Sequence, residues 1–348
     1  MYRAGLRTPC EPGMRGSSIW VMCLSWVLAG AAVAADSPQV AVDATSVTLQ
    51  VGGRAVGRYR YAEVPFKPYL QELRTPSGIN ILRDAPFDHL HHHSLMFAVA
   101  VDGVNFWEEK NGLGKQEHLA IRDVFAGQAG GLPCASFKQE LTWGAGGKGL
   151  LHETRAIRVL ADPAGKASLV SWTAEFREPG PDGRTAGTGS PAVTFGGERY
   201  YGLGMRFVTS MDKTGQFVNA DDGKGVEGTN DKQSRWCAYT AEAEGKPVTV
   251  AMFDHPTNAR HPANWFTMLE PFSYLCATLG LHHEKLALGR AASRPAEPQA
   301  SASPFRLSYG VAVWDGKQQQ DEIERVYGLW VKSVESRQAG KETGNKAP

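Results

Sequence analysis

Residues 157–176 read IRVLADPAGKASLVSWTAEF, and this stretch decides the fold class. Two segments with alternating polarity flank the turn-forming sequence DPAGK, a pattern that is typical of a β-hairpin. The second segment places Val170, Trp172, Ala174 and Phe176 on one face. A strand of this kind has one buried and one solvated face, as in antiparallel sheets.

The same alternation recurs on both sides of this hairpin. SVTLQV (46–51) and RAVGRYRYAEV (54–64) are joined by two glycines, which favours a second hairpin. Further strands are predicted in SFKQELTW (136–143), LLHETRAIRVL (150–160), KPVTVAMFDHP (246–256) and FRLSYGVAVWDG (305–316). No alternation of strands and helices is visible. The sequence therefore predicts an all-β protein built as a large antiparallel β-sandwich.

A C-terminal helix is predicted within DGKQQQDEIERVYGLWVKSVESR, residues 315–337. Its apolar residues recur at helical spacing: Ile323, Val326, Tyr327, Trp330, Val331 and Val334. We expect this helix to pack on the edge of the sandwich, and a partner-binding face is the alternative. The remaining residues, 338–348, are predicted to be a disordered tail.

The N-terminal segment is typical of a secretory signal peptide. Arg3, Arg7 and Arg15 precede a short uncharged run that ends in small residues, with Ala32 and Ala34 at the spacing of a cleavage site. Translation could also begin at Met14, and an uncleaved anchor is the alternative to cleavage. We therefore expect a signal peptide over 1–34, a single sandwich domain over 35–337, and a periplasmic or secreted protein without a membrane span in its mature chain.

The charge is almost balanced, with 37 basic and 36 acidic residues. This balance argues against a nucleic-acid partner, which would favour a basic surface.

Three cysteines follow the signal segment: Cys134, Cys237 and Cys276. They form no paired motif, so we expect their side chains to be buried as small hydrophobic groups. The sequence RYYGLGMRFV lacks the glycine spacing of a nucleotide-binding loop. We expect no nucleotide, flavin or haem, and the sequence leaves the oligomeric state open.

The sequence PFDHLHHHSLMFAVA (86–100) holds four of the ten histidines within five positions. Either as a strand or as a turn, this segment can direct two or three imidazoles into a common space. Neutral imidazole binds divalent metals, so His89, His91 and His92, completed by His118, are candidate ligands of one ion. Asp88 and His92 are candidate acid–base residues instead. A hydrogen-bonded polar rim is the structural alternative.

A second polar cluster lies in FDHPTNARHPANWF (253–266), directly after a predicted strand. Aromatic faces pack on sugar rings while polar side chains bind hydroxyls, so this loop resembles the wall of a sugar-binding cleft. Its candidate catalytic residues are His255 and Arg260. Its candidate substrate-binding residues are Asp254, Asn258, His261 and Trp265. A proline-stiffened connector is the structural alternative.

Two further groups complete the candidate site. Glu108 and Glu109 follow Trp107, and adjacent residues of a strand face opposite ways, so at most one of them can serve a given cleft. Glu108 is our candidate catalytic carboxylate. Arg206, in the glycine-flanked segment 199–208, is a candidate substrate-binding residue.

Three segments together resemble the PmoA-like family of exported bacterial domains: 68–109, GKQEH (114–118) and 253–266. The resemblance extends from about Val40 to Val331. Its DH-x-HH element matches Asp88, His89, His91 and His92, whereas His93 and Ser94 stand where the family often has Arg-Gly. By analogy to β-sandwich proteins that act on sugars, the fold could take the form of a galactose-mutarotase-like supersandwich.

The resemblance implies a location and a site more than a reaction. The methane monooxygenase activity in the family's name does not fit a chain without a membrane span beyond its N-terminal segment. We predict an exported carbohydrate-active enzyme, a hydrolase or lyase acting on a glycoside or oligosaccharide at the histidine-rich site. The alternative is a non-catalytic periplasmic glycan-binding or structural sandwich.

Overall fold

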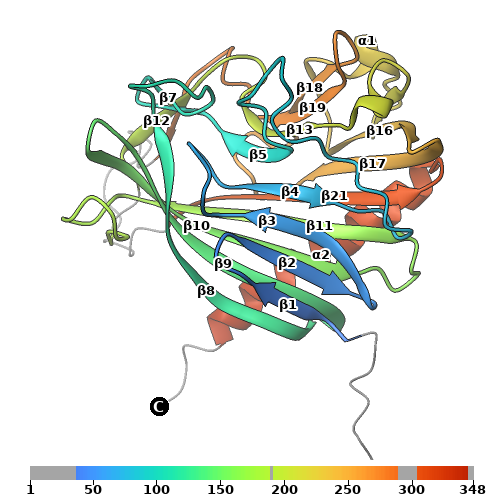
Figure 1. The fold of residues 1–348 in the computed structure, drawn as a ribbon, viewed down its shortest axis with the longest axis horizontal. Coiled ribbons are helices and arrows are strands. Elements are labelled where there is room, and N and C mark those ends of the chain that lie inside the picture. Colours follow the sequence, from blue (N-terminus) through green and yellow to red (C-terminus); the bar gives the residue numbers. More distant parts are fainter. Residues whose placement is uncertain (1–36, 189–190, 289–303, 344–348) are drawn as a thin grey trace, which may run out of the picture. The chain divides into compact units, whose positions relative to one another are not determined.

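The computed structural model describes residues 37–188, 191–288 and 304–343. Within these ranges the chain forms three antiparallel sheets and a long C-terminal helix, which confirms the predicted all-β sandwich with its helix (Figure 1). These residues belong to one compact unit that spans residues 34–348. The predicted signal peptide, 1–34, and residues 344–348 lie outside the described ranges.

The largest sheet has nine strands and carries the candidate histidines between two of its central strands. Its order is β1 (Gln39–Val42), β2 (Ser46–Val51), β3 (Arg54–Arg60), β4 (Tyr69–Leu73), β5 (Leu95–Ala98), β13 (Gly202–Arg206), β19 (Tyr274–Thr278), β18 (Asn264–Met268) and β15 (Lys232–Gln233). The histidine segment connects β4 to β5, which are neighbours in this sheet.

The second sheet has eight strands and contains the hairpin of residues 157–176. Its order is β14 (Gln216–Asn219), β16 (Trp236–Ala243), β17 (Lys246–Asp254), β21 (Phe305–Asp315), β11 (Ala167–Arg177), β10 (Lys148–Ala161), β9 (Leu132–Ala145) and β8 (Lys115–Ala129). A four-stranded sheet adds β20 (Leu286–Leu288), β12 (Val193–Gly196), β6 (Ala100–Val101) and β7 (Val104–Asn105). Two short helices, η1 (Thr209–Met211) and α1 (Gly225–Thr229), lie in connections.

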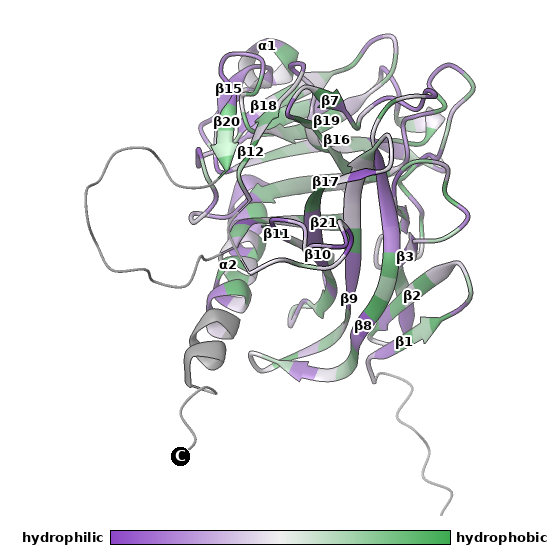
Figure 2. Cartoon of the chain, turned by 90° about the vertical axis from the view of Figure 1, so that its left-hand side faces the viewer, coloured by the Kyte–Doolittle hydropathy of each residue, from purple (hydrophilic) through white to green (hydrophobic). Residues whose placement is uncertain are grey.

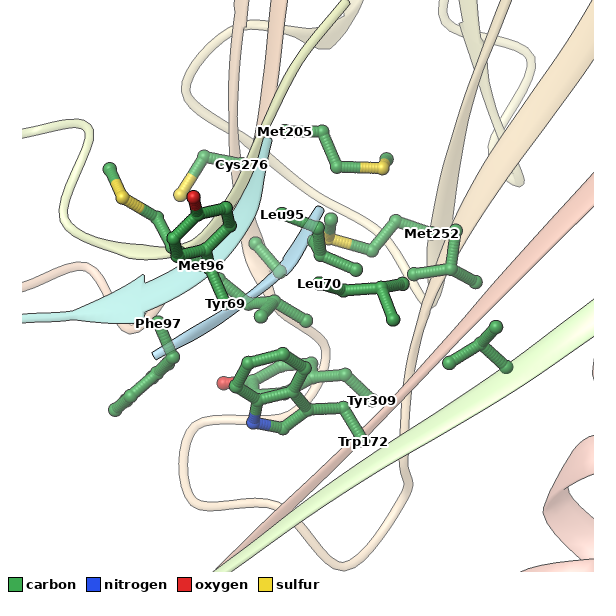
Figure 3. Packing of buried hydrophobic residues seen from close by; sticks show 14 of the residues in the cluster. Tyr69, Leu70, Leu95, Met96, Phe97, Trp172, Met205, Met252, Cys276 and Tyr309 are labelled. Atoms are coloured by element: carbon green, nitrogen blue, oxygen red, sulfur yellow. The ribbon is translucent and has the colours of Figure 1, made fainter. Parts of the chain in front are cut away.

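The main core lies between the two large sheets. Figure 3 shows Leu70 and Leu95 of the nine-stranded sheet gathered with Trp172, Met252 and Tyr309 of the eight-stranded sheet. All five side chains are almost completely buried. The face predicted for β11, which carries Trp172, therefore does point into the core. Burial of apolar area on this scale is the dominant stabilising contribution to the fold.

The hairpin turn of residues 162–166 is joined to the C-terminal helix. The Asp162 carboxylate accepts hydrogen bonds from the backbone N–H groups of Ala164, Lys166 and Ala167, which close the turn. Arg325 in α2 (Gln320–Thr343) donates two hydrogen bonds of 2.9 Å to the same carboxylate. The turn thus holds both the hairpin and the helix.

Helix α2 covers a face of the eight-stranded sheet, and not its edge as predicted (Figure 2). Ile323, Val326 and Trp330 form a second apolar cluster with Phe253 and Trp314 on the outer side of that sheet. Central strands of the sheet are consequently buried on both faces. The helix continues to Thr343, so the tail predicted from residue 338 is helical at its start. Across the described part of the chain, no helix is both long enough and apolar enough to cross a membrane.

Candidate functional site

The histidine segment opens onto a cavity of about 900 Å³. One part of its wall is aromatic and consists of Trp107, Tyr200, Phe266, Phe272 and Tyr274. The other part is polar and includes His89, His91, His92, Glu108, Arg199, Asn230 and Glu270. We call this space the aromatic cavity. Its volume lies within the range of about 300–1,000 Å³ that is usual for small-molecule sites.

Two consecutive turns place the histidines in the cavity wall. The backbone N–H of His89 donates to the carbonyl of Pro86 at 2.9 Å, and that of His92 donates to the carbonyl of His89 at 2.9 Å. Ala85 then bonds to the carbonyl of His92, which closes the segment at its base. The turn alternative therefore describes this segment better than a continuous strand.

Three imidazoles are packed against one another in this segment. The rings of His89 and His92 stack with centroids 4.6 Å apart, and the ring of His91 meets His92 edge-on at 4.6 Å. Burial, aided by the neighbouring imidazoles, lowers the pKa of His92 to about 2. Burial also lowers the pKa of His91, with the Lys67 ammonium as a further cause. Both rings are therefore neutral at neutral pH.

The aromatic wall is built from stacked rings of different loops and strands. The Trp107 indole stacks on Tyr201 with centroids 5.1 Å apart and an interplanar angle of 10°, and it meets Tyr200 edge-on at 5.4 Å. The Trp107 Nε1 and the Tyr274 hydroxyl are buried without a hydrogen-bond partner among the described residues. Most buried donors in proteins have a hydrogen-bond partner, so these two groups are exceptions in this wall.

Asp88 and Arg206 form an ion pair behind the histidines. Arg206 Nη2 lies 3.1 Å from Asp88 Oδ2, and its guanidinium stacks on the Phe272 ring at 3.4 Å. Asp88 also lies 3.2 Å from His89 Nδ1, and this carboxylate has a lowered pKa: burial opposes ionisation, but the bonds to His89 and Arg206 outweigh it. Arg206 is almost completely buried and does not line the aromatic cavity. We therefore assign both residues to positioning the histidine segment.

A second group of charges is buried behind the cavity. Lys67 Nζ lies 2.6 Å from Glu109 Oε1, and Glu109 Oε1 lies 3.0 Å from His93 Nε2. His93 Nδ1 in turn lies 2.7 Å from Asp84 Oδ1, and the Tyr69 hydroxyl donates to Asp84 at 2.6 Å. Burial opposes protonation of His93, but its bonds to Asp84 and Glu109 outweigh this effect and raise its pKa. We call these five residues the buried charge network.

Adjacent residues divide between the cavity and this network. Glu108 lines the cavity while Glu109 enters the network, although both lie in the loop after β7 and not in a strand. His92 and His93 divide in the same way. Asn105 shapes the first of these segments, because its side-chain oxygen accepts the backbone N–H groups of Trp107 and Glu108.

The four predicted metal ligands are not brought together. His118 lies on β8 at the end of the other large sheet, where its ring packs on Tyr61 and its Nδ1 lies 3.0 Å from the Gln139 amide nitrogen. His89, His91 and His92 also form no set of ligand atoms within 4.8 Å of one another. The prediction of a shared site with His118 is wrong, because His118 packs against Tyr61 and Gln139, outside the cavity that the other three histidines line.

The loop that follows β17 also lies outside the aromatic cavity, so the prediction that it shares one cleft with the histidines is wrong. Asp254 Oδ2 lies 2.7 Å from His261 Nδ1, and Asp254 Oδ1 accepts the Asn258 amide at 2.6 Å. The His255 ring packs edge-on against Trp330 of helix α2. These hydrogen bonds and contacts hold the loop itself together.

The other two residues of this loop likewise have structural roles. Arg260 donates hydrogen bonds to four backbone carbonyls of residues 279–285. The buried Trp265 indole donates to the carbonyl of Ser234 at 2.8 Å. Neither residue faces the aromatic cavity.

Sequence reasoning missed several cavity residues that come from distant segments. Arg199, Tyr200, Asn230, Phe266, Glu270 and Phe272 belong to three separate stretches. No motif joins these stretches, although Tyr200 lies within segment 199–208 and Phe266 is the last residue of segment 253–266, and the sequence singled out both segments. Lys67 and Asp84 were missed because an isolated charge in sequence is usually solvated.

The fold and the cavity define an antiparallel β-sandwich protein with an aromatic, histidine-bearing pocket on its nine-stranded sheet. The model of a family of unknown function, DUF6807, matches residues 46–328. This match covers most of the chain, so the chain belongs to that family. The resemblance to the PmoA-like family stays a prediction.

The other comparisons find no curated relative and a distant structural neighbour. No curated protein matches the sequence. One similar solved structure is the galactosidase domain of alpha-galactosidase-sucrose kinase, AgaSK, with a TM-score of 0.39 and 9% sequence identity. The similarity covers 81% of this chain and 41% of that chain, so this chain spans less than half of that neighbour's length.

Proposed function

We propose that this protein is an exported enzyme that binds a carbohydrate in the aromatic cavity and transfers a proton there through a neutral imidazole. The observation that carries this proposal is the combination of an aromatic wall with three histidines in one space of about 900 Å³. We propose that the site is catalytic. A turnover experiment distinguishes this role from glycan binding without catalysis.

Carbohydrate is the ligand class that this wall fits best. The apolar faces of sugar rings pack on aromatic side chains, and Tyr200 and Phe266 supply such faces here. Glu108, Asn230 and Arg199 add the donors and acceptors that hydroxyl groups need. A flat apolar ligand would leave these polar groups without partners after water is displaced, which costs binding free energy.

His91 is our candidate for accepting the proton. Burial lowers its pKa, so the imidazole is neutral and basic at neutral pH. The much lower pKa of His92, about 2, makes that ring a poor base, and we assign it to positioning His91 and the ligand. Glu108 has a lowered pKa, mainly through its bond to Lys110, and stays ionised beside the histidines.

This arrangement is compatible with two reactions. In a lyase, His91 would remove a proton from a ring carbon next to a carboxyl group, with Arg199 facing that carboxylate. The C–O bond on the neighbouring carbon would break as the ring C=C bond forms, and the expelled sugar oxygen would take a proton from water. In a hydrolase, His91 would take a proton from the water that attacks the glycosidic carbon, while the glycosidic C–O bond breaks and the leaving oxygen takes a proton from solvent. Because both reactions use the same base, the products must decide between them.

The test is a turnover screen of the purified protein on neutral and uronic-acid oligosaccharides. New reducing ends without unsaturated products would indicate a hydrolase, and new ultraviolet absorbance from unsaturated products would indicate a lyase. We expect His91→Ala to lower kcat/KM by about 100-fold or more. The matched control is His118→Ala, which removes an imidazole outside the cavity and should keep the activity. If the wild type binds an oligosaccharide but does not turn it over, the protein is a glycan-binding protein and the catalytic proposal is overturned.

A further inference from the structure

A second cluster of potential ligands lies outside the aromatic cavity. The cluster consists of Asp231, His282 and His283, and each of these residues places one possible ligand atom within 4.8 Å of the other two. Among the described residues, this is the one group of three or more His, Cys, Asp or Glu side chains with such spacing. Asp231 precedes β15, and the two histidines lie in the turn after β19. We propose that these three side chains bind one divalent transition-metal ion, an activity independent of the proposed carbohydrate reaction.

Two of the three distances between ligand atoms match a tetrahedral metal site, and the third is within 4.8 Å. Asp231 Oδ1 lies 3.4 Å from His282 Nε2 and 3.0 Å from His283 Nε2. Zinc binds imidazole and carboxylate at about 2.0–2.1 Å, which separates tetrahedral ligand atoms by about 3.3 Å. The two imidazole rings lie with centroids 3.7 Å apart, so both Nε2 atoms can approach one ion from the same side.

The donor set selects the class of metal. Two imidazole nitrogens and one carboxylate oxygen suit Zn²⁺, Ni²⁺ or Cu²⁺, whereas Ca²⁺ and Mg²⁺ prefer oxygen ligands alone. His282 Nδ1 is buried without a hydrogen-bond partner among the described residues, which leaves Nε2 as the nitrogen that faces Asp231.

Neighbouring side chains hold the ligands in place, as in most metal sites. The Asn264 amide donates to Asp231 Oδ1 at 2.8 Å and so orients the carboxylate. Arg260 Nη1 donates to the carbonyls of Leu279 and Glu284 at 2.7 and 3.0 Å, which fixes the turn on both sides of the histidines. The polar loop that the sequence singled out thus has a role here, as the support of the histidine turn.

The site leaves room for further ligands. Asp231 and His283 line a groove of about 590 Å³ together with Arg260, His261, Asn264 and Glu284. Three protein ligands leave one tetrahedral position open, and this position would face water or a small molecule in the groove.

The test is a titration of Zn²⁺ into the tag-free, chelator-treated protein in competition with a chromophoric chelator. We expect one equivalent of Zn²⁺ to bind, and Ca²⁺ and Mg²⁺ to give no signal. His283→Ala and His282→Ala should each weaken Zn²⁺ binding by about 100-fold or more, and Asn264→Ala by about 10–100-fold. The thermal midpoint of each variant in chelator should equal that of the wild type, because these side chains lie near the surface.

The matched control is the variant His89→Ala/His91→Ala, which removes two imidazoles from the aromatic cavity. It should bind Zn²⁺ as the wild type does. The proposal is overturned if no Zn²⁺ binds, if His282→Ala/His283→Ala binds it unchanged, or if the control variant loses it. None of these readouts depends on carbohydrate turnover, so each proposal can fail alone.

Discussion

At the residue scale, substitutions of the adjacent residues Glu108 and Glu109 should have clearly different effects on the free energy of unfolding. Glu109 is paired with buried Lys67, whereas Glu108 is one-third exposed and pairs with Lys110. Removing one partner of a buried pair leaves an uncompensated charge, so Glu109→Gln should lower the free energy of unfolding by about 3–5 kcal/mol. Glu108→Gln should change it by about 0.5 kcal/mol or less. Urea unfolding at neutral pH measures both, and equal losses would contradict the buried charge network.

The pH dependence of this difference has a defined sign. The pKa of Glu109 is lowered in the folded protein, because its bonds to His93 and Lys67 outweigh the opposing effect of burial. A lowered carboxyl pKa stabilises the fold above the unfolded value of about 4.3 and loses this contribution as pH falls through the folded value. The stability gap between the wild type and Glu109→Gln should therefore shrink below about pH 4, where the carboxylate becomes protonated. Between pH 7 and 5 the gap should hold or widen, because Glu109 also raises the pKa of His93. A gap that already shrinks between pH 7 and 5 would show that Glu109 is not ionised in the native state.

At the scale of elements, the contact between β21 and helix α2 depends on one glycine. A Cβ atom added at Gly310 would lie 2.7 Å from the Trp330 indole and 2.9 Å from the Phe253 ring. Both neighbours are buried in the cluster under the helix, so Gly310→Ala should destabilise the protein by about 1–3 kcal/mol.

Gly328 in the same helix is the matched control for this test. A Cβ there would meet no heavy atom within 4 Å, and alanine favours the helix more than glycine does. We expect Gly328→Ala to stabilise the protein by about 0.5–1 kcal/mol in thermal unfolding. If both alanine variants shift the midpoint in the same direction, the close approach at Gly310 is not the cause.

The sequence predicted the strands better than the site because strand signals are local. The hairpin of residues 157–176 was predictable from alternation and the DPAGK turn, and Trp172 and Phe176 do face the core. The position of helix α2 on the sheet was not predictable from the sequence. Both faces of a central strand such as β21 are buried, so the residues of that strand do not alternate in polarity and do not show which face the helix covers. The partners of His93 and Glu109 were also not predictable, because Lys67 and Asp84 reach them only through sheet pairing.

At the scale of the whole molecule, packing between the sheets holds the sandwich together without covalent links. In residues 37–188, 191–288 and 304–343, Cys134, Cys237 and Cys276 are buried thiols and no disulfide forms. Burial raises the pKa of the Cys237 and Cys276 thiols, which keeps them protonated and unreactive.

A reducing agent should therefore leave the thermal midpoint of the folded domain unchanged. A thiol reagent should label these cysteines only after denaturant has unfolded the chain, as measured by the number of groups released with and without urea. A lower midpoint under reduction, or rapid labelling of the native protein, would mean that a cysteine is cross-linked or exposed.

The most direct test of the account is equilibrium binding of oligosaccharides to the aromatic cavity. Isothermal titration would compare the wild type with Phe266→Ala, and Phe125→Ala on strand β8 would control for loss of an aromatic ring outside the cavity. We predict saturable binding of at least one oligosaccharide, weakened about 2- to 10-fold by Phe266→Ala, since an aromatic contact contributes about 0.5–1.5 kcal/mol. Phe125→Ala should bind like the wild type. Binding that is absent from the wild type, or that is unchanged in Phe266→Ala, would contradict the assignment of this cavity to carbohydrate.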